Sequence, residues 1–414
     1  MNFVIRCAAI AVGLLSLVPA LSAQWEPPVG IPAPTFGIEE QAPAFTHYVD
    51  NTHPNATDSG NPTGSPAVPR LTVPTPLPAG GVVEVHGGPY SVPISWTSNG
   101  TAAEPVFIRG VGEPIFQSSG SALRFFGSYL IVEGLVFDDI NLSLRAPIDH
   151  FTLRHCEVRN YSPPSNSAAI GVIGEHIVLY DNHIHDNGDP DSPSEIDIHG
   201  IKPDTDTNQL WIVDNHIHDN GGDSVQVGNA NSAEPWAQSI YIGRNVMHGD
   251  RENAVDIKRA RDVIVSQNIA FDYQPSNSSS GSGMVFHDQP DRIWVLFNEV
   301  FEVSIGIIST GSDGFYVIGN LVHSITDETD PGSLFGSEAM HARATSDILF
   351  VANTIWDINK GISVPSGTGP VEFVGNVIGG LTTASHQLAI GNTDLADAST
   401  MSHNLLGGEA RIRW

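Results

Sequence analysis

Residues 177–188 read IVLYDNHIHDNG, and residues 210–221 repeat them almost unchanged as LWIVDNHIHDNG. Each copy holds a short apolar run, then an asparagine, then one more apolar residue between polar neighbours. Weaker copies continue along the chain as IYIGRNVMHGD, VIVSQNIAFDY, IWVLFNEVF, FYVIGNLVHS, ILFVANTIWD and VEFVGNVIGG. Their asparagines are Asn182, Asn215, Asn245, Asn268, Asn298, Asn320, Asn353 and Asn376, and Asn404 closes the series. A unit that recurs this often indicates a repeat architecture.

The spacing of these asparagines sets the size of the repeat. Successive asparagines lie 22 to 33 residues apart, which fits a base period of 22 or 23 residues with insertions. A second apolar segment precedes most of them, as in HGIKPD, DSVQVG, NAVDIK and GMVFHD. Coils of this length with two or three short strands predict an all-β protein, a parallel β-helix of about ten coils. The asparagines would form an inward-facing ladder, each amide bonding the coils above and below.

The repeat extends toward the N-terminus with other residues in the ladder slot. Cys156 and Gly134 occupy that slot ahead of Asn182, at similar spacings. A cysteine there predicts a small buried residue. A β-propeller would need about four strands for every 40–45 residues, and it does not explain the asparagine column.

The chain divides into three segments by composition. Residues 1–23 have the pattern of a secretory signal peptide, with Arg6, the apolar run AAIAVGLLSLVPA and LSA before the predicted cleavage site. Residues 24–80 are rich in Pro, Gly and Ser, which predicts an extended N-terminal arm and a cap segment. Residues 81–414 predict a single β-helix domain. Because Cys7 leaves with the signal, we expect no disulfide.

The charge of the chain restricts its partners and its location. A formal net charge of −28 argues against nucleic acid, whose binding depends on Lys and Arg. After the signal segment no stretch is long and apolar enough to span a membrane. We therefore expect a secreted or periplasmic protein that recruits cations and does not bind nucleic acid. We expect it to be a monomer.

The scarce basic residues gather in one stretch. Residues 244–261, RNVMHGDRENAVDIKRAR, hold five of the 18 Lys and Arg residues, and Lys258 is one of only three lysines. The run NAVDIK alternates apolar and polar residues, as a half-buried strand does. If its valine and isoleucine face a core, then Glu252, Asp256 and Lys258 share the opposite face. Two carboxylates and a lysine on one strand face make a candidate reaction centre.

Neighbouring coils add further polar residues to this candidate site. Aligned on the ladder asparagines, four strand ends fall side by side at Asp204, Gly228, Lys258 and His287. Coils in such a stack lie about 4.8 Å apart, so Lys258 and His287 are expected to be neighbours. The insertions that lengthen the repeat fall on the same coils, at 186–199, 228–238 and 273–283. Loops in these positions would form the walls of a groove.

The repeat pattern resembles the right-handed parallel β-helix superfamily typified by pectate lyases, and especially its polysaccharide-lyase branches. The resemblance covers nearly the whole chain after the signal, and it is sharpest at HGIKPDTDTNQLWIVDNHIHDNGGDSVQV and DRENAVDIKRARDVIVSQN. It implies a lysine or arginine base at a strand end and calcium held by acidic residues of neighbouring coils. The chain departs from the acidic run and downstream arginine of the alginate-lyase and chondroitinase B-like family. It also lacks the consecutive aspartates of the pectate lyases that use a lysine base.

This resemblance implies β-elimination of a uronate polymer, which needs a base and a cationic partner for the substrate carboxylate. We predict that Lys258 is the base and that Arg251 or Arg259 binds the carboxylate. His287, His199 and Lys202 are further candidates for proton transfer. The alternative for Lys258 is a surface ion pair that contributes little.

The same resemblance implies a calcium ion, for which Asp223, Glu252 and Asp256 are the predicted ligands. A lysine beside Asp256 should have a raised pKa, which does not suit a base. A bound divalent cation would reverse that effect, so Lys258 as base agrees better with a metal than without one.

The histidines of the repeats have a simpler interpretation. They lie three residues after a ladder asparagine, where other coils have Phe271, Phe301 and Trp356, and they are His185, His218, His248 and His323. A column shared with aromatic residues predicts a ladder of stacked rings rather than a zinc site, since two histidines at i and i+2 are not a strong ligand spacing.

The sequence thus predicts an exported polysaccharide lyase acting on an acidic, uronate-containing polysaccharide. One alternative is a hydrolase or epimerase on the same scaffold, with a carboxylate pair drawn from Asp204, Glu252, Asp256 and Asp288. Another is a non-catalytic β-helix that binds glycans or serves in adhesion.

Overall fold

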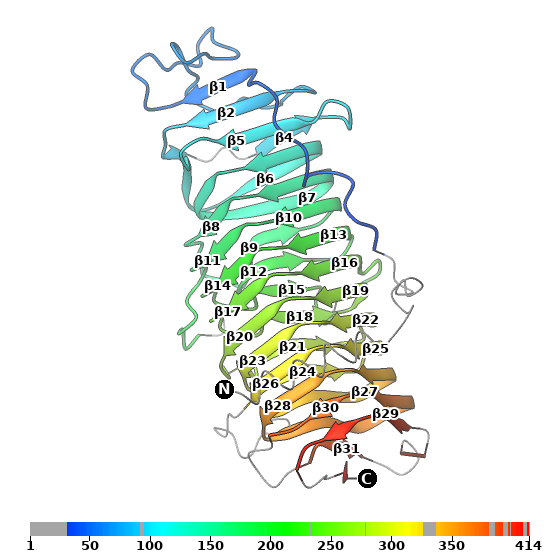
Figure 1. Ribbon diagram of the computed structural model, residues 1–414. Helices are drawn as coiled ribbons and strands as arrows, with labels where there is room; N and C mark the ends of the chain where they lie inside the picture. Colours follow the sequence, from blue (N-terminus) through cyan, green and yellow to red (C-terminus); the bar gives the residue numbers. More distant parts are fainter. Residues whose placement is uncertain are drawn as a thin grey trace, which may run out of the picture. The chain divides into compact units, whose positions relative to one another are not determined.

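From residue 47 onward, the strands of the described residues stack coil upon coil and pair into three parallel faces, here called sheets (Figure 1). The first sheet contains β9 (Ser167–Val172), β12 (Ile198–Pro203), β15 (Val225–Val227), β18 (Val255–Lys258), β21 (Ser282–His287) and β24 (Ile305–Thr310). The second contains β10 (Glu175–Tyr180), β13 (Asn208–Val213), β16 (Ala237–Gly243), β19 (Ala260–Ser266), β22 (Asp291–Leu296) and β25 (Asp313–Ile318). The third contains β8 (Glu157–Arg159), β11 (His183–His185), β14 (His216–His218), β17 (Val246–His248), β20 (Ile269–Tyr273), β23 (Glu299–Val303), β26 (Leu321–Ile325), β28 (Thr354–Ile358), β30 (Val377–Ile378) and β33 (Leu405–Leu406).

Longer strands continue these sheets toward both ends of the stack. β6 (Ile115–Glu133) and β7 (Val136–Arg154) each run through all three sheets, as their pairings with β8, β9 and β10 show. β27 (Glu338–Val351) and β29 (Lys360–Val374) run through the first and second sheets. The fold is therefore the predicted parallel β-helix.

The computed structural model describes residues 31–91, 95–194, 196–231, 233–277, 279–325, 337–380, 386–391, 396–397, 399–408 and 412–413. The chain divides into residues 1–32 and 33–414, and the predicted signal peptide at 1–23 lies outside the described residues. Within the described ranges, no helix is long and apolar enough to cross a membrane. The stack begins at β1 (His47–Asp50), inside the predicted arm and cap segment, where β1 pairs in parallel with β2 (Val82–His86).

One continuous apolar core fills the inside of the stack. Alternate residues of each strand face inward, and the buried cluster reaches from Val49 to Ile390. The apolar segments read from the sequence, such as HGIKPD and NAVDIK, fall on β12 and β18. Each coil alone cannot bury its apolar face, so stacking is what creates the core.

Asparagine side chains form the predicted ladder at the corner between the second and third sheets. From Asn182 to Asn404, each Nδ2 donates to the Oδ1 of the next asparagine at 2.9–3.0 Å. The same Nδ2 also donates to a backbone carbonyl of the preceding coil, as Asn298 does to Val265 at 2.9 Å. The Oδ1 also accepts a backbone N–H, as in the 2.9 Å bond from Asn268 to Asn298. Every polar atom of these buried amides is thus satisfied.

The residue before each ladder asparagine turns the corner between the sheets. It has a φ between 50° and 69° at Asp181, Asp214, Arg244, Gln267, Phe297, Gly319, Ala352, Gly375 and His403. This left-handed conformation costs a residue with a Cβ roughly 1–2 kcal/mol. The hydrogen bonds of the asparagine that follows offset this cost at each coil.

The ladder slot at the N-terminal end confirms one prediction and corrects another. Cys156 occupies the slot, because its backbone N–H donates to Asn182 Oδ1 at 3.0 Å. It is a free, buried cysteine, and burial raises the pKa of its thiol to about 12. The placement of Gly134 was wrong by one residue, since the pairing of β7 with β8 puts the buried Leu135 opposite Cys156. Gly134 instead has a φ of 67° and occupies the corner position.

We predict that Asn298→Ala lowers the free energy of unfolding by about 2–3 kcal/mol, because it leaves several buried donors and acceptors without partners. The measurement is the midpoint of denaturant-induced unfolding. Asn404→Ala is the matched control, since this partly buried asparagine lies at the last rung of the ladder, and we expect it to cost less. Equal effects at the two positions would contradict the ladder as the source of stability.

Candidate active site

The strand β18 presents its polar residues outward, as the sequence predicts. Val255 and Ile257 are fully buried in the core, so Asp256 and Lys258 lie on the opposite face of the first sheet. Glu252 precedes the strand and is only 7% exposed. The alternation of NAVDIK therefore separates the core from a polar outer face.

His287 lies beside Lys258 on the next strand. It ends β21, and the parallel register of β18 and β21 pairs it directly with Lys258. The registers of β12, β15 and β18 extend this column to Gly228 and Asp204. The four aligned strand ends predicted from the asparagine spacing thus lie in one column.

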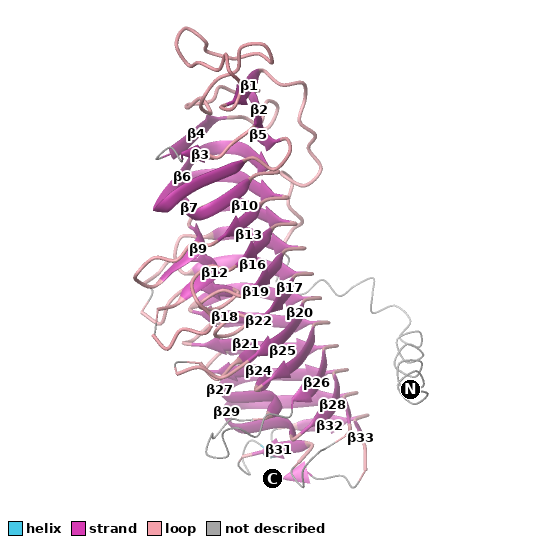
Figure 2. Ribbon diagram, turned by 90° about the vertical axis from the view of Figure 1, so that its left-hand side faces the viewer, coloured by secondary structure: helices cyan, strands magenta, loops and turns pink. Residues whose placement is uncertain are grey.

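The long insertions leave the stack beside these strands (Figure 2). Residues 186–197 lead into β12, residues 228–236 follow β15, and residues 274–281 lead into β21. The loops therefore flank the first sheet on the coils that carry Lys258 and His287.

Asp256, Lys258 and His287 form one hydrogen-bonded cluster, here called the Asp256 triad. Asp256 Oδ2 lies 2.8 Å from Lys258 Nζ, and Asp256 Oδ1 lies 2.9 Å from His287 Nε2. The other ring nitrogen of His287 lies 3.4 Å from a carboxylate oxygen of Asp288. Asp256 is 4% exposed, so its charge is held by its two partners rather than by water.

The triad shifts the pKa of each of its members. Burial disfavours the Asp256 carboxylate, but the hydrogen bond and charge of His287, with Lys258, overcome burial and lower the pKa of Asp256 to about 2. Burial also lowers the pKa of Lys258, yet Asp256 outweighs it and the pKa rises above the ordinary value. Burial lowers the pKa of His287 too, but the hydrogen bond and the charge of Asp256 raise it above the ordinary value. At neutral pH the triad therefore contains a carboxylate and an ammonium group.

A second group of side chains lies buried near the triad and is here called the buried donor group. It contains His199 of β12, Asp223 and Glu252, each with a ligand atom within 4.8 Å of the other two. The backbone N–H of Asp223 donates to His199 Nδ1 at 3.0 Å, so this nitrogen carries no proton. Asp223 Oδ2 lies 3.2 Å from the same nitrogen and is a buried oxygen with no hydrogen-bond donor among the described residues.

The pKa values of this group reflect its burial. Burial and then Asp256 raise the pKa of Asp223 to about 8. Burial and then Lys202 lower the pKa of His199 to about 4. A bound cation would favour the ionised form of Asp223, and a buried oxygen without a donor beside a neutral imidazole fits such a cation. Of the predicted calcium ligands, Asp223 and Glu252 belong to this group, whereas Asp256 belongs to the triad. Calcium prefers oxygen ligands, which the two carboxylates supply and the imidazole does not.

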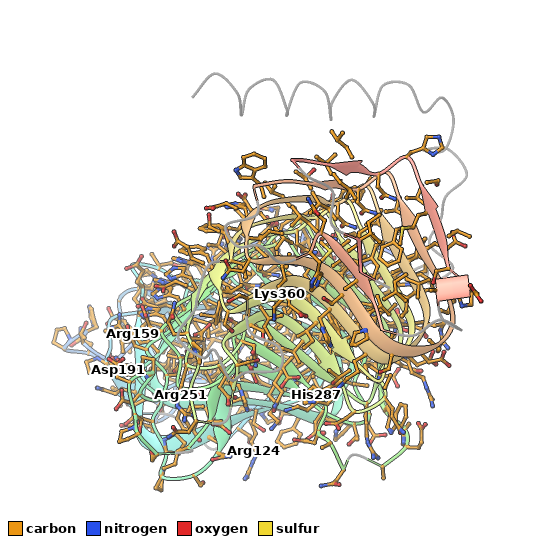
Figure 3. All side chains as sticks on the ribbon, turned by 90° about the horizontal axis from the view of Figure 1, so that it is seen from below. Arg124, Arg159, Asp191, Arg251, His287 and Lys360 are labelled. Atoms are coloured by element: carbon orange, nitrogen blue, oxygen red, sulfur yellow. The ribbon has the colours of Figure 1, made fainter. Side chains whose placement is uncertain are left out.

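The two arginines predicted to bind the substrate carboxylate, Arg251 and Arg259, have different surroundings in the structure. Arg251 has a side chain only 3% exposed, and its Nη1 lies 2.9 Å from Asp197 Oδ1. This guanidinium is therefore engaged by the 186–197 loop (Arg251 and His287 are labelled in Figure 3). Arg259 follows Lys258, is half-buried and has a φ of 45°.

Lys202 lies on the outer face of the first sheet, two coils from Asp256. The strand registers place Gln226 between these two residues. Burial lowers the pKa of Lys202, with Asp204 acting against it. Gln226 is a site residue that sequence reasoning did not select, and its Oε1 is buried without a hydrogen-bond partner in the described part of the chain.

A second short ladder beneath the site was also missed. Asn187 Nδ2 donates to Asn220 Oδ1 at 2.8 Å, and Asn220 Nδ2 donates to Asp250 Oδ1 at 2.7 Å. Tyr273 and Ser224 donate to the other oxygen of Asp250, while burial raises the pKa of Asp250 to about 7. The signal in the sequence is that each of these three residues follows a ladder asparagine by five positions.

Comparisons with known proteins agree with the fold. No protein-family model matches the chain, and no curated protein sequence matches it significantly. Among solved structures, a mannuronic acid-specific polysaccharide family 6 lyase from human gut microbiota has a TM-score of 0.51 and 14% identity, covering 79% of this chain and 86% of the other. A second family 6 alginate lyase has a TM-score of 0.55 and 15% identity, covering 81% of this chain but only 50% of its own.

A third structure, the A-module of a mannuronan C-5 epimerase from Azotobacter vinelandii, has a TM-score of 0.50 and 16% identity, and the match covers 81% of this chain and 89% of the other. These likenesses show a shared fold, the right-handed parallel β-helix, and confirm the resemblance read from the repeats.

We predict that Asp256→Asn lowers the pKa of His287 below its wild-type value, because burial and Lys258 then act without the carboxylate. The measurement is the titration of the His287 ring by NMR, assigned with His287→Gln. In the wild type, the raised pKa means that the pair stabilises the fold below pH 6.5 and loses this contribution as pH rises through the folded pKa. An unchanged His287 titration in Asp256→Asn would contradict the triad.

Proposed function

We propose that this protein is an exported polysaccharide lyase that cleaves a uronate-containing polysaccharide by β-elimination at the outer face of the first sheet. The observation that carries the proposal is the Asp256 triad, which holds a lysine and a histidine side by side on adjacent strands. The fold agrees with it, since lyases and an epimerase named for mannuronate polymers share this architecture. Fold likeness alone does not define a reaction, so the proposal depends on the triad.

The triad offers the two proton transfers that β-elimination needs. Neutral Lys258 takes the proton next to the uronate carboxylate, the bond to the leaving oxygen breaks, and a carbon–carbon double bond forms. Protonated His287 gives its proton to the leaving oxygen. Exchange with solvent then removes the proton from Lys258 and returns one to His287, while Asp256 stays ionised and holds both groups in place.

Lys258 must lose its proton before it acts, and its surroundings oppose this. Asp256, Asp223 and Glu252 all raise the pKa of Lys258. A cation held by the buried donor group would place a positive charge near Lys258 and lower its pKa. We propose a divalent cation here, and calcium is the first to test.

Neither Asp256 nor Asp223 fits the general acid of a hydrolase. An inverting or retaining glycosidase needs one carboxyl group that is protonated and able to reach the glycosidic oxygen. Asp256 has a pKa of about 2 and stays ionised. Asp223 has a pKa of about 8, but its side chain is fully buried. An epimerase shares the first proton transfer and differs only in returning a proton instead of expelling the leaving group.

We also propose that the protein is secreted or periplasmic. The support is the signal-peptide pattern at 1–23 and a substrate class that is extracellular. Polysaccharides too large to enter a cell require an enzyme that is exported.

The test incubates the protein with a panel of alginate, pectate and glycosaminoglycan substrates and measures the ultraviolet absorbance of the unsaturated product. We predict that Lys258→Ala and Lys258→Arg each lower kcat by ~100-fold or more, since arginine keeps the charge but cannot serve as a base at neutral pH. Lys360→Ala is the matched control, a lysine of the same sheet that lies near Glu338, and its activity should stay near that of the wild type.

Other outcomes would revise the proposal. Activity that survives Lys258→Arg would make Lys258 a charge partner and move the base to Lys202 or His287. A change in uronate composition by NMR without an unsaturated product would indicate an epimerase. New reducing ends without that product would indicate a hydrolase. Loss of activity with chelator, restored by calcium, would support the cation.

A further inference from the structure

Five histidines gather on the outer face of the third sheet, which is a different sheet from that of the Asp256 triad. They are His183 and His185 on β11, His216 and His218 on β14, and His248 on β17 (Figure 1). The strands pair in register, which sets His183 beside His216, and His185, His218 and His248 in a second column. The residue between each histidine pair is fully buried, so the histidines all face outward.

The rings of both columns stack, since His183 and His216 of the first column lie 5.0 Å apart and nearly parallel. The second column continues the predicted ladder of stacked rings, with centroids 4.7–5.1 Å apart, through His185, His218, His248, Phe271, Phe301 and His323. The first column adds contacts that stacking does not require. His183 Nε2 lies 2.7 Å from His218 Nε2, and His216 Nε2 lies 2.9 Å from His248 Nε2. Ring nitrogens from neighbouring coils therefore lie within hydrogen-bonding distance of each other.

We propose that His183, His216 and His218 bind a divalent transition-metal ion of the zinc, nickel and copper class. One ring nitrogen of each residue lies within 4.8 Å of the other two. Ligand nitrogens around tetrahedral zinc lie about 3.3 Å apart, given Zn–N distances of about 2.0–2.1 Å, so rotations of the rings bring them into place. Imidazole ligands favour these ions over calcium and magnesium.

Carboxylates next to the cluster orient its rings. His218 Nδ1 lies 2.7 Å from Asp219 Oδ2, which fixes the proton on Nδ1 and leaves the lone pair of Nε2 facing His183. His185 Nδ1 makes the same contact with Asp186 at 2.6 Å. A carboxylate on the second ring nitrogen is the usual support for a metal-binding histidine, because it fixes the tautomer and raises ligand basicity.

The surroundings suit a cation. His183 and His216 line a cavity of about 370 Å³ together with Glu157, Asp181 and Asp214. Asp214 pairs with Arg244 and Glu157 with Arg159, whereas Asp181 lies beside His155. Burial, followed by the neighbouring imidazoles, lowers the pKa of His183 to about 4 and also lowers that of His216. Both rings are thus neutral at pH 7, which is the form that binds metal.

The test is isothermal titration of zinc into the full-length protein, prepared without a polyhistidine tag and stripped with chelator. We expect saturable binding of zinc. We expect His183→Ala and His216→Ala each to weaken the affinity for one zinc ion per protein by tenfold or more. Asp219→Asn should weaken it by about tenfold, through loss of ring orientation. His323→Ala is the matched control, a histidine of the same column outside the cluster, and it should bind as the wild type does.

Cobalt(II) gives a second readout that does not depend on a variant. We expect visible bands of imidazole-bound cobalt in the wild type that disappear in His216→Ala, a variant of an exposed residue that should leave the fold intact. No saturable zinc binding, or equal binding by the wild type and both histidine variants, would overturn the proposal. Binding lost only in Asp223→Asn would place the metal in the buried donor group and also overturn it. The proposed lyase activity is not read out in either measurement.

Discussion

An asparagine amide that bonds the coils on both sides fixes the register of this protein. Each ladder asparagine from Asn182 to Asn376 is buried and uses its two donors and its acceptor between neighbouring coils. A shift of one coil against the next would break these bonds and bury unsatisfied amides. Insertions must therefore leave the stack as loops, which is why repeats of 22 and of 33 residues fit the same fold.

With a fixed register, equivalent residues of successive coils form columns on the outer faces of the sheets. Because coils stack in parallel, residues at equivalent positions lie one step apart on an outer face, whatever their separation in sequence. Lys258 and His287 become neighbours in this way, with Asp256 bridging them, although His287 is 29 residues further along the chain. The same rule builds the histidine cluster on the third sheet. One scaffold thus carries two polar clusters of different composition: carboxylates, lysine and single histidines on the first sheet, and a group of histidines on the third.

The sequence predicts the fold because the ladder and the strands have strict periods. It also predicts the column of Lys258 and His287, since that depends only on register. It predicts that Lys258 lies beside Asp256 with a raised pKa, which the structure confirms, but it does not predict the other partners of Asp256 and Asp223. Asp256 was expected to bind a cation with Asp223, but it contacts Lys258 and His287, and His199 takes its place beside Asp223. These choices depend on side-chain rotamers and burial. Arg251 contacts Asp197, which lies in an insertion loop, and the repeat period does not predict the path of such a loop. Gly134 was assigned one residue too early, because a shift of one residue barely changes the apparent spacing of the repeats.

The most direct test is a crystal structure of Lys258→Ala with a bound oligosaccharide of the uronate polymer that the wild type cleaves. We predict that the sugar lies on the outer face of the first sheet, across β15, β18 and β21, with a uronate ring next to His287 and the position of the missing Lys258 side chain. An oligosaccharide bound on another sheet, or on coils away from β18, would contradict the assignment of the Asp256 triad as the reaction centre.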